Sequence, residues 1–387
     1  MTPAARIAAA AAVLDRVLAG AAAEAALIGW ARGARYAGSG DRAAVRDLVY
    51  DGLRRRGRHA LHAGLSGAED PRLTGRALMI GALADPDAFF TGEGHAPAPL
   101  TEAERAARAG GPVGSAADDL PAWLHAPLAE ALGEDFPAYA EAMSHRAPVW
   151  LRVNALRADL ATAQAALAAE DIATAPHPAC ATALRVTGGE RRISRSRAYL
   201  DGLVELQDLS PQRAVAELGG LAGLSVLDYC AGGGGKALAL AAQGAARVVA
   251  HDAKPGRMAD LPARAARAGA RIEMAPPQGR FDLVVADVPC SGSGTWARDP
   301  DARWRLSPEG FAQLSDIQSE ILDDAAGHVG PGGRLAYMTC SVLRAENEDR
   351  IAVFAARSGL RPALMRRFGP PGNGDGFFLA VLESAAD

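Results

Sequence analysis

The pattern of hydrophobic and polar positions divides the chain into three zones. In the first, residues 1–143, the stretches AARIAAAAAVLDRVLAG and DRAAVRDLVYDGLRRRGRHALHAGL repeat apolar residues every three or four positions and contain no proline. This spacing predicts amphipathic helices that pack as a small bundle. The residues between Ala84 and Pro121 are rich in glycine and proline and predict a loop or linker.

The second helical stretch contains a run of arginines. We expect Asp41 to be the N-cap of this helix and the arginines to point mostly outward. Two interpretations of the run stay open, a solvated helix face or a contact with RNA. The run consists of Arg54, Arg55, Arg56 and Arg58.

The second zone, residues 144–215, predicts a small α+β extension. A short strand followed by a helix is predicted for VWLRVNALRADLATAQAALAAEDI. The same small fold continues through ALRVTGGERRISRSRAYLDGLVELQDLS. This zone is a second candidate surface for phosphate, the alternative being an exposed charged loop without a partner. The arginines concerned are Arg152, Arg185, Arg191, Arg192, Arg195 and Arg197.

The third zone, residues 216–387, alternates apolar strands with helical stretches. The strands LSVLDYC, ARVVAHD, FDLVVAD and GGRLAYMTC are apolar along their whole length, which predicts a parallel α/β sheet covered on both faces. Ligands of such sheets bind at the carboxyl ends of the strands. The residues at those ends are Asp228, Cys230, Asp252, Asp287, Cys290 and Cys340.

Composition narrows the class of protein. The 387 residues are 49% hydrophobic and 22% charged with a formal net charge of −4, typical of a globular chain of two or three domains. We find no transmembrane stretch or signal peptide and expect a cytoplasmic protein, which we take to be a monomer. The four cysteines lie far apart without a Cys-x-x-Cys pair, so we expect reduced thiols and no metal site. Overall charge does not indicate a nucleic-acid partner, although local arginine patches can.

The stretch VLDYCAGGGGKALAL predicts a strand, a glycine turn and a helix that bring backbone close to a ligand. A phosphate-binding P-loop would need a glycine at Cys230 and a hydroxyl at Ala237, so that motif is excluded. Gly232, Gly234 and an acidic residue about twenty positions on, Asp252, fit a nucleotide-binding loop better. Asp252 either accepts both ribose hydroxyls of S-adenosylmethionine or caps the next helix.

Taken together, LDYCAGGGGK, VVAHD, FDLVVADVPCSGSG, DPDARW, LSDIQSEILDDA, GGRLAYMTCSVLRAENE and GDGFF resemble the RNA cytosine-5 methyltransferases, in particular bacterial ribosomal-RNA enzymes of the RsmB type. The resemblance covers nearly the whole chain. It implies a Rossmann-like methyltransferase domain at 216–387, a NusB-like helical domain with linker at 1–143 and a small α+β RNA-binding extension at 144–215. S-adenosylmethionine is then the cofactor and ribosomal RNA the partner.

The chemistry of that family explains the two thiols. Carbon 5 of cytosine is too weak a nucleophile to take a methyl group unaided, and attack of a thiolate on carbon 6 activates it. The resemblance implies that Cys340 is the nucleophile, that Cys290 assists release, that Asp287 holds the cytosine amino group or the donor, and that Lys236 orients the loop and the base. It implies cofactor contacts from Cys230, Ala231, Gly232, Gly233, Gly234, Gly235, Lys236, Asp252 and Asp287.

The chain departs from the family pattern at two places. Gly232 and Gly233 replace an Ala-Pro pair in the loop, which makes the unbound loop more mobile. The aspartate expected after the third strand, a contact for adenine, is missing, and only Glu273 and Gln278 lie nearby. These departures favour one alternative, an RNA-binding ribosome-assembly factor with weakened catalysis. An amino methyltransferase acting on DNA fits less well, because such enzymes use Asp/Asn-Pro-Pro-aromatic where this chain has DVPC.

Overall fold

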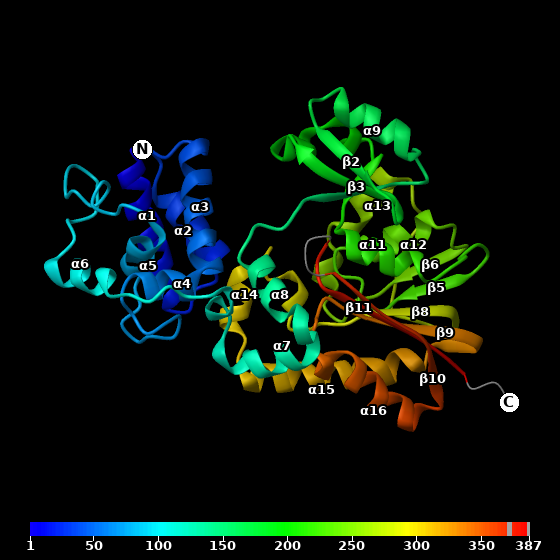
Figure 1. Ribbon diagram of the computed structural model, residues 1–387. Coiled ribbons are helices and arrows are strands. Elements are labelled where there is room, and N and C mark those ends of the chain that lie inside the picture. The colour runs from blue at the N-terminus through cyan, green and yellow to red at the C-terminus, as the bar shows by residue number, and fades with distance from the viewer. Residues whose placement is uncertain (370–373, 385–387) are drawn as a thin grey trace. The chain divides into compact units, whose positions relative to one another are not determined.

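The computed structural model describes residues 1–369 and 374–384 (Figure 1). The chain forms two compact units. The helical unit contains residues 1–146 and 296–308, and the sheet unit contains residues 147–295 with the described residues from 309 onward. The boundaries expected from the sequence, 1–143, 144–215 and 216–387, remain a prediction about separately folding domains.

The helical unit buries one apolar core made by Val13 and Leu14 of α1, Val45 and Val49 of α3 and Leu78 of α5. Helical periodicity therefore predicts its architecture. Its helices are α1 (Pro3–Leu18), α2 (Ala23–Gly33), α3 (Ser39–Arg54), α4 (Arg56–His62), α5 (Gly75–Ala82), α6 (Glu102–Ala109), α7 (His125–Leu132), α8 (Phe136–Met143) and α14 (Pro300–Arg305).

The long second helical stretch of the sequence is two helices, because α3 ends at Arg54 and α4 begins at Arg56. The prediction that Asp41 is the N-cap is wrong. Gly38 is the N-cap, and Asp41 is the third residue of α3. Its carboxylate accepts from the Gly38 amide at 3.3 Å and from Arg6 Nε at 2.9 Å, so it supports the helix start from inside the first turn.

Residues 296–308 leave the sheet unit and pack within the helical unit. Arg303 is fully buried there and donates to the carbonyls of Leu53 at 3.3 Å and Arg54 at 2.7 Å. Trp304 Nε1 also donates to the Leu53 carbonyl, at 3.0 Å. These donors satisfy carbonyls at the end of α3 that have no partner within the helix.

The sheet unit begins with a small antiparallel sheet of order β2-β3-β1-β4. Leu151 and Val153 of β1 pack on Leu167 of α9, which gives the small α+β fold that the second zone predicts. Its elements are β1 (Trp150–Val153), α9 (Leu160–Ala168), β2 (Ala173–His177), β3 (Cys180–Gly188), α10 (Arg197–Leu200) and β4 (Val204–Leu206).

The larger sheet has the order β10-β11-β9-β8-β5-β6-β7. Pairing among β5 to β9 is parallel, as predicted, whereas β10 and β11 add an antiparallel edge. The strands are β5 (Ser225–Asp228), β6 (Arg247–Ala250), β7 (Glu273–Met274), β8 (Phe281–Asp287), β9 (Val329–Thr339), β10 (Leu360–Phe368) and β11 (Phe377–Ser384).

Helices cover both faces of this sheet, as Figure 1 shows. One face packs on α11 (Leu209–Ala216), α12 (Gly235–Ala242) and α13 (Leu261–Ala268), and the other on α15 (Pro308–Ala326) and α16 (Glu348–Ser358). This is the two-faced coverage expected of apolar parallel strands. Within residues 1–369 and 374–384, no helix has the length and apolar character needed to cross a membrane.

Candidate active site

The glycine loop joins β5 to α12 and brings backbone to the carboxyl edge of the sheet. Gly232 and Gly234 have φ of +52° and +79°, a region that favours glycine. A Cβ on Gly234 would lie 2.2 Å from Leu261 Cδ1, so a larger residue would have to displace the Leu261 side chain as well as adopt an unfavourable φ. The sequence therefore needs glycine here to fit the loop between the sheet and α13.

Asp252 follows the end of β6 and is hydrogen-bonded to the glycine loop. Its carboxylate accepts from the Gly232 amide at 3.0 Å and from the Lys254 amide at 2.8 Å, and it pairs with Arg257 at 3.3 Å. The side chain is buried. Asp252 thus contacts the predicted cofactor loop directly, although it does not line the cavity in front of that loop.

A cavity of about 470 Å³ opens in front of the glycine loop, within the size range of small-molecule sites. Most of the predicted site residues line it, and of the predicted set Gly234 and Asp252 do not. The predicted residues that line the cavity are Cys230, Ala231, Gly232, Gly233, Gly235, Lys236, Asp287, Cys290 and Cys340.

Asp228 also lines the cavity, at the strand end where the sequence places it, although no role is predicted for it from the sequence. It is fully buried, and its two carboxylate oxygens have no hydrogen-bond partner within the described part of the chain. Burial raises the pKa of this carboxyl to about 7. A buried acceptor of this kind fits a cationic group of a ligand.

Lys236 and Asp287 form an ion pair on the cavity wall, with Lys236 Nζ 2.5 Å from Asp287 Oδ2. Lys236 Nζ also lies 5.2 Å from the centre of the Phe377 ring. Burial opposes the charge of Lys236, but Asp287 outweighs burial and raises the pKa of the ammonium group. The lysine therefore keeps a positive charge at the place where the loop meets the two thiols.

The two thiols at the ends of β8 and β9 face one another. Cys290 Sγ lies 3.3 Å from Cys340 Sγ. The contact with Cys340 and burial raise the pKa of Cys290 well above its usual value, so Cys290 stays a thiol at neutral pH. Burial also raises the pKa of Cys230, to about 12, which makes it a poor nucleophile. Cys180 is buried in the small sheet, beside Thr182, and is not part of this cavity.

Sequence reasoning missed a buried polar group behind the thiols. Gln318, Ser291, Glu346 and Asn347 hydrogen-bond one another or the backbone beside Cys290 and Cys340. The only signal for them is that polar residues occur inside otherwise apolar or helical motifs, LSDIQSEILDDA and TCSVLRAENE. Pattern alone does not say that these side chains turn inward.

The structure does not supply the missing acidic contact near the third strand. Glu273 lies on β7, where its carboxylate pairs with Arg247 at 2.8 Å, and it does not line the cavity. Gln278 is likewise outside the lining. Neither side chain replaces the expected aspartate.

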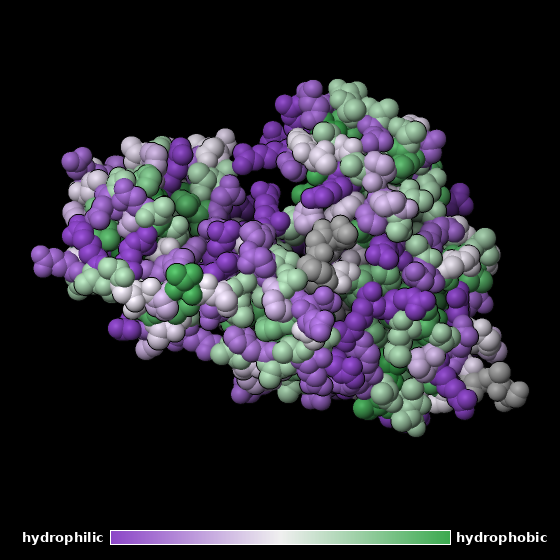
Figure 2. Space-filling view, in the orientation of Figure 1, coloured by the Kyte–Doolittle hydropathy of each residue, from purple (hydrophilic) through white to green (hydrophobic). Residues whose placement is uncertain are grey.

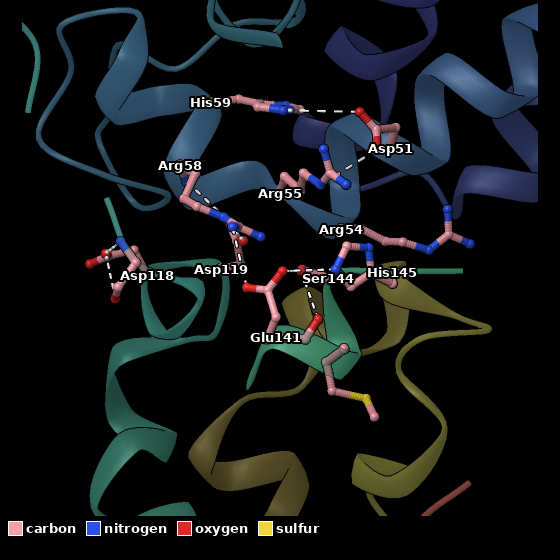
Figure 3. A network of polar contacts seen from close by, with 12 residues as sticks. Asp51, Arg54, Arg55, Arg58, His59, Asp118, Asp119, Glu141, Ser144 and His145 are labelled. Carbon is pink, nitrogen blue, oxygen red and sulfur yellow. Dashed lines mark hydrogen bonds and ion pairs between the residues drawn. The ribbon is translucent and has the colours of Figure 1, made fainter. Parts of the chain in front are cut away.

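Most arginines of the run in the helical unit make contacts within that unit. In Figure 3, Arg58 points to Asp119, at 2.7 Å, and to Glu141, at 3.4 Å. Arg54 Nε donates to the Ala297 carbonyl at 3.0 Å, and Arg56 lies 4.6 Å from the Trp304 ring centre. These residues are partly buried. The expectation of an outward-pointing run is therefore wrong, because the run packs α4 and residues 296–308 within the unit.

The arginines of the small sheet are arranged differently. Figure 2 shows hydrophilic residues spread over the visible face of each unit. Hydropathy alone therefore marks no basic surface, and we locate one from the exposure of the individual arginines. Arg152 is buried on β1. The exposed arginines are Arg185, Arg191, Arg192, Arg195 and Arg197.

Parallel strands β5 to β9, a glycine loop opening α12 and a cavity at the carboxyl edge of the sheet make up a Rossmann-like fold of the methyltransferase type. Residues 222–383 match the model of the 16S rRNA methyltransferase RsmB/F family. Residues 120–191 match the ferredoxin-like domain of RsmF/B-like methyltransferases. Through these two regions the chain belongs to the RsmB/F methyltransferase family.

Curated relatives agree with this assignment. The ribosomal RNA small subunit methyltransferase B of Klebsiella pneumoniae subsp. pneumoniae is 33% identical over 286 residues, which cover 68% of this chain and 65% of the relative. The protein of the same name from Vibrio cholerae is 34% identical over 281 residues, which cover 68% of this chain and 64% of the relative. The matched part thus spans about 65% of the length of the first of these relatives.

Solved structures share the fold. The crystal structure of PH0851 has a TM-score of 0.73 and 23% identity, covering 99% of both chains. NSun6 from Pyrococcus horikoshii, solved with SFG, has a TM-score of 0.61 and 16% identity, covering 69% of this chain and 99% of that one. At these identities the likeness concerns the fold.

Proposed function

We propose that this protein transfers a methyl group from S-adenosylmethionine to carbon 5 of a cytosine in small-subunit ribosomal RNA. The observation that carries the proposal is the pair of thiols, Cys290 and Cys340, 3.3 Å apart on the wall of the cavity that the glycine loop bounds. A hydride-transfer or phosphate-transfer site has no use for two adjacent thiols, whereas methylation of carbon 5 uses one to attack and one to assist release.

The cavity fits the cofactor on two counts. The backbone of Gly232 to Gly235 approaches the cavity without side chains, and Asp228 presents a buried carboxylate without a hydrogen-bond partner among the described residues. When bound, S-adenosylmethionine supplies an electrophilic methyl group on a positively charged sulfur. Asp228 would accept from its ammonium group, and the glycine loop would lie along its chain. Asp252 would accept from the ribose in place of its ion pair with Arg257, while keeping its bonds to Gly232 and Lys254.

The two thiols have different roles in the reaction. Cys340, as the thiolate, attacks carbon 6 of the cytosine, and carbon 5 becomes nucleophilic enough to take the methyl group. A water molecule then takes the proton from carbon 5, and elimination of Cys340 as the thiolate restores the ring. Cys290, held as a thiol, assists that release. The Lys236–Asp287 pair supplies a fixed positive and a fixed negative group beside the base, which orients the base and its exocyclic amino group.

We further propose that the small sheet and the helical unit bind the RNA. The exposed arginines between Arg185 and Arg197 supply positive charge on the region that matches the family's ferredoxin-like domain. The NusB-like identity of the helical unit belongs to this proposal, supported by its all-helical core. Its arginine run carries less of the RNA binding than its sequence indicates, because all four side chains are partly buried and make contacts within the unit.

The test is methylation of small-subunit RNA by the purified full chain. Naked RNA and small-subunit particles lacking the modification are incubated with S-adenosylmethionine, and bisulfite sequencing locates any new 5-methylcytosine. We expect one or a few protected cytosines, lost in Cys340→Ala. RNA binding without methylation in either substrate would instead support the RNA-binding assembly factor.

A further inference from the structure

The backbone on both sides of Cys290 is held by one buried pair. Gln318 Nε2 donates to the Pro289 carbonyl at 3.0 Å and to Glu346 Oε1 at 3.0 Å. Glu346 accepts from the Ser291 amide at 2.7 Å and from Ser291 Oγ at 2.5 Å. The residues before and after the thiol are therefore tied to the same carboxylate and amide.

The residues on both sides of Cys340 are held by Asn347, which follows Glu346 in the sequence. Asn347 Nδ2 donates to the Ser341 carbonyl at 2.9 Å, and Thr339 Oγ1 donates to Asn347 Oδ1 at 2.6 Å. Thr339 and Ser341 flank the thiol. One amide side chain therefore fixes the residues before and after Cys340, as Gln318 and Glu346 do for Cys290.

Three hydroxyl groups join the two halves. Ser341 Oγ lies 3.3 Å from Ser291 Oγ and 3.0 Å from Ser293 Oγ. All three serines are buried, and so are Glu346, Asn347 and Gln318. Tyr337 Oη donates to the Glu346 carbonyl at 2.7 Å, which holds the backbone of this position against β9. Buried groups that satisfy one another in this way resist displacement, because moving one leaves its partners without a hydrogen bond.

We propose that Glu346 and Asn347 are positioning residues that set the distance between the two thiols, Glu346 acting with Gln318 on Cys290 and Asn347 acting on Cys340. The proposal rests on the proposed function for its purpose, since methylation needs both sulfurs at one base. The arrangement also explains why a carboxylate lies buried here. Three donors converge on Glu346, and the two oxygens of its side chain accept all three hydrogen bonds.

The distance between the thiols can be measured without RNA. Diamide takes two electrons and two protons from a pair of thiols, and an internal disulfide forms only when the two sulfurs can approach to about 2 Å. From the starting separation of 3.3 Å we expect this chain to react rapidly. The rate of Cys290–Cys340 disulfide formation, followed by mass spectrometry, therefore reports the positioning of the thiols.

The variants are Glu346→Ala, Asn347→Ala and Gln318→Met, each in the full chain. Gln318→Met keeps the volume of the side chain and removes its hydrogen-bond donors. It therefore tests the proposal even if the alanine variants fail to fold. Glu346→Gln keeps the shape and most hydrogen bonds, because Ser291 Oγ can accept from the new amide. Glu348→Ala is the matched control, since Glu348 is a nearby acid that pairs with Arg367 and touches neither thiol turn.

We expect disulfide formation to slow about tenfold or more in the variants that remove these hydrogen bonds, with wild-type rates in Glu348→Ala and substantial rescue in Glu346→Gln. In the methylation assay kcat should fall by up to about 10²-fold, as for misplacement by roughly 1 Å, while KM for S-adenosylmethionine stays within a factor of about two. Wild-type disulfide rates in folded Glu346→Ala, Asn347→Ala or Gln318→Met would overturn the proposal. Because the disulfide assay contains no RNA, it decides the positioning role even if methylation fails.

Discussion

Arg264 of α13 bridges the small sheet and the glycine loop: its guanidinium donates to the Gly233 carbonyl and pairs with Glu205 of β4 at 3.1 Å. Glu205 is buried, so the pair is anchored. The loop carries Gly232 and Gly233 where similar methyltransferases have Ala-Pro, and two glycines cost more conformational entropy to order than that pair. Arg264 restrains the loop from outside, in place of the restraint that a proline builds into the backbone.

Replacing Arg264 with alanine should therefore weaken binding of S-adenosylmethionine. Loss of a charge-assisted hydrogen bond to the loop is worth about 1.4 kcal/mol, or about tenfold in Kd. Isothermal titration calorimetry measures it. Arg271→Ala, at an exposed arginine beyond α13, is the control and should bind as the wild type does. Equal affinities in both variants would show that the loop orders without Arg264.

Asp252 and Arg257 should respond in opposite ways. Asp252→Ala removes the acceptor for Gly232 and for the ribose, and should weaken cofactor binding by about 1.5 to 3 kcal/mol. Arg257→Gln removes only the ion pair that competes for the same carboxylate, so affinity should be unchanged or higher. Calorimetry on both variants separates these effects. A loss of affinity in Arg257→Gln equal to that in Asp252→Ala would place the arginine, and not the aspartate, in the binding role.

The two thiols should give different products when removed. Cys340→Ala should form no covalent RNA adduct and transfer no methyl group at a detectable rate, because nothing attacks carbon 6. Cys290→Ala should still attack and methylate but release slowly, so protein bound to methylated RNA accumulates as a slower-migrating band on a denaturing gel. The reverse pattern would falsify this division and make Cys290 the nucleophile. Methylation in both variants without a band would mean that neither thiol is catalytic.

Asp228 should make stability depend on pH. Its folded pKa of about 7 lies above the unfolded value of 3.8, so the folded protein holds an extra proton between these values. The favourable contribution is complete below pH 3.8 and is lost as pH rises towards 7, by up to about 1.4 kcal/mol per pH unit. Urea unfolding of the wild type and Asp228→Asn at pH 5 and 8 should show the variant gaining relative stability at pH 8. An equal stability difference at both pH values would contradict the buried, protonated carboxyl.

RNA affinity should depend on the exposed arginines of the small sheet. Replacing three of them by glutamine, Arg185, Arg195 and Arg197, should weaken binding and flatten its salt dependence, by roughly 0.7 to 0.9 in slope for each phosphate that is no longer neutralised. The control replaces three exposed arginines elsewhere in the sheet unit, Arg271, Arg361 and Arg366. Filter binding at several salt concentrations measures both. Equal reductions in affinity in the two triple variants would assign the effect to net charge alone.

Local patterns predict much of this structure. Strands β5, β6, β8 and β9 contain apolar runs, and the residues just beyond β8 and β9 place Cys290 and Cys340 on one cavity with Asp287 of β8. Lys236 reaches the same cavity from the start of α12. The antiparallel edge of β10 and β11 is not predicted, because nothing within LRPALMRRF or FFLAVLES fixes the direction in which each strand pairs with its neighbour. The roles of Glu346 and Asn347 are not predicted either, since polar residues near a helix start usually indicate solvent or a cap, and their burial depends on packing with α15 and β8.

The arginine run shows a second limit of sequence. Arg54 and Arg56 look like a solvated or RNA-facing stripe, but residues 296–308 return from the sequence of the sheet unit to pack on them. No periodicity within either stretch reveals a partner so far along the chain. Contacts between distant segments are the information that local pattern lacks.

The position of α14 bears on how the protein is made. On the ribosome, α1 to α8 emerge first, but Arg303, Trp304 and the rest of residues 296–308 are synthesised only after the strands β1 to β8. Until then the carbonyls of Leu53 and Arg54 lack the donors that α14 brings. Residues 1–146, which are most of the helical unit, therefore stay incompletely stabilised until residues 296–308 have been synthesised. Nascent chains that stall before residue 296 should accordingly be more sensitive to protease within α3 and α4 than the finished protein.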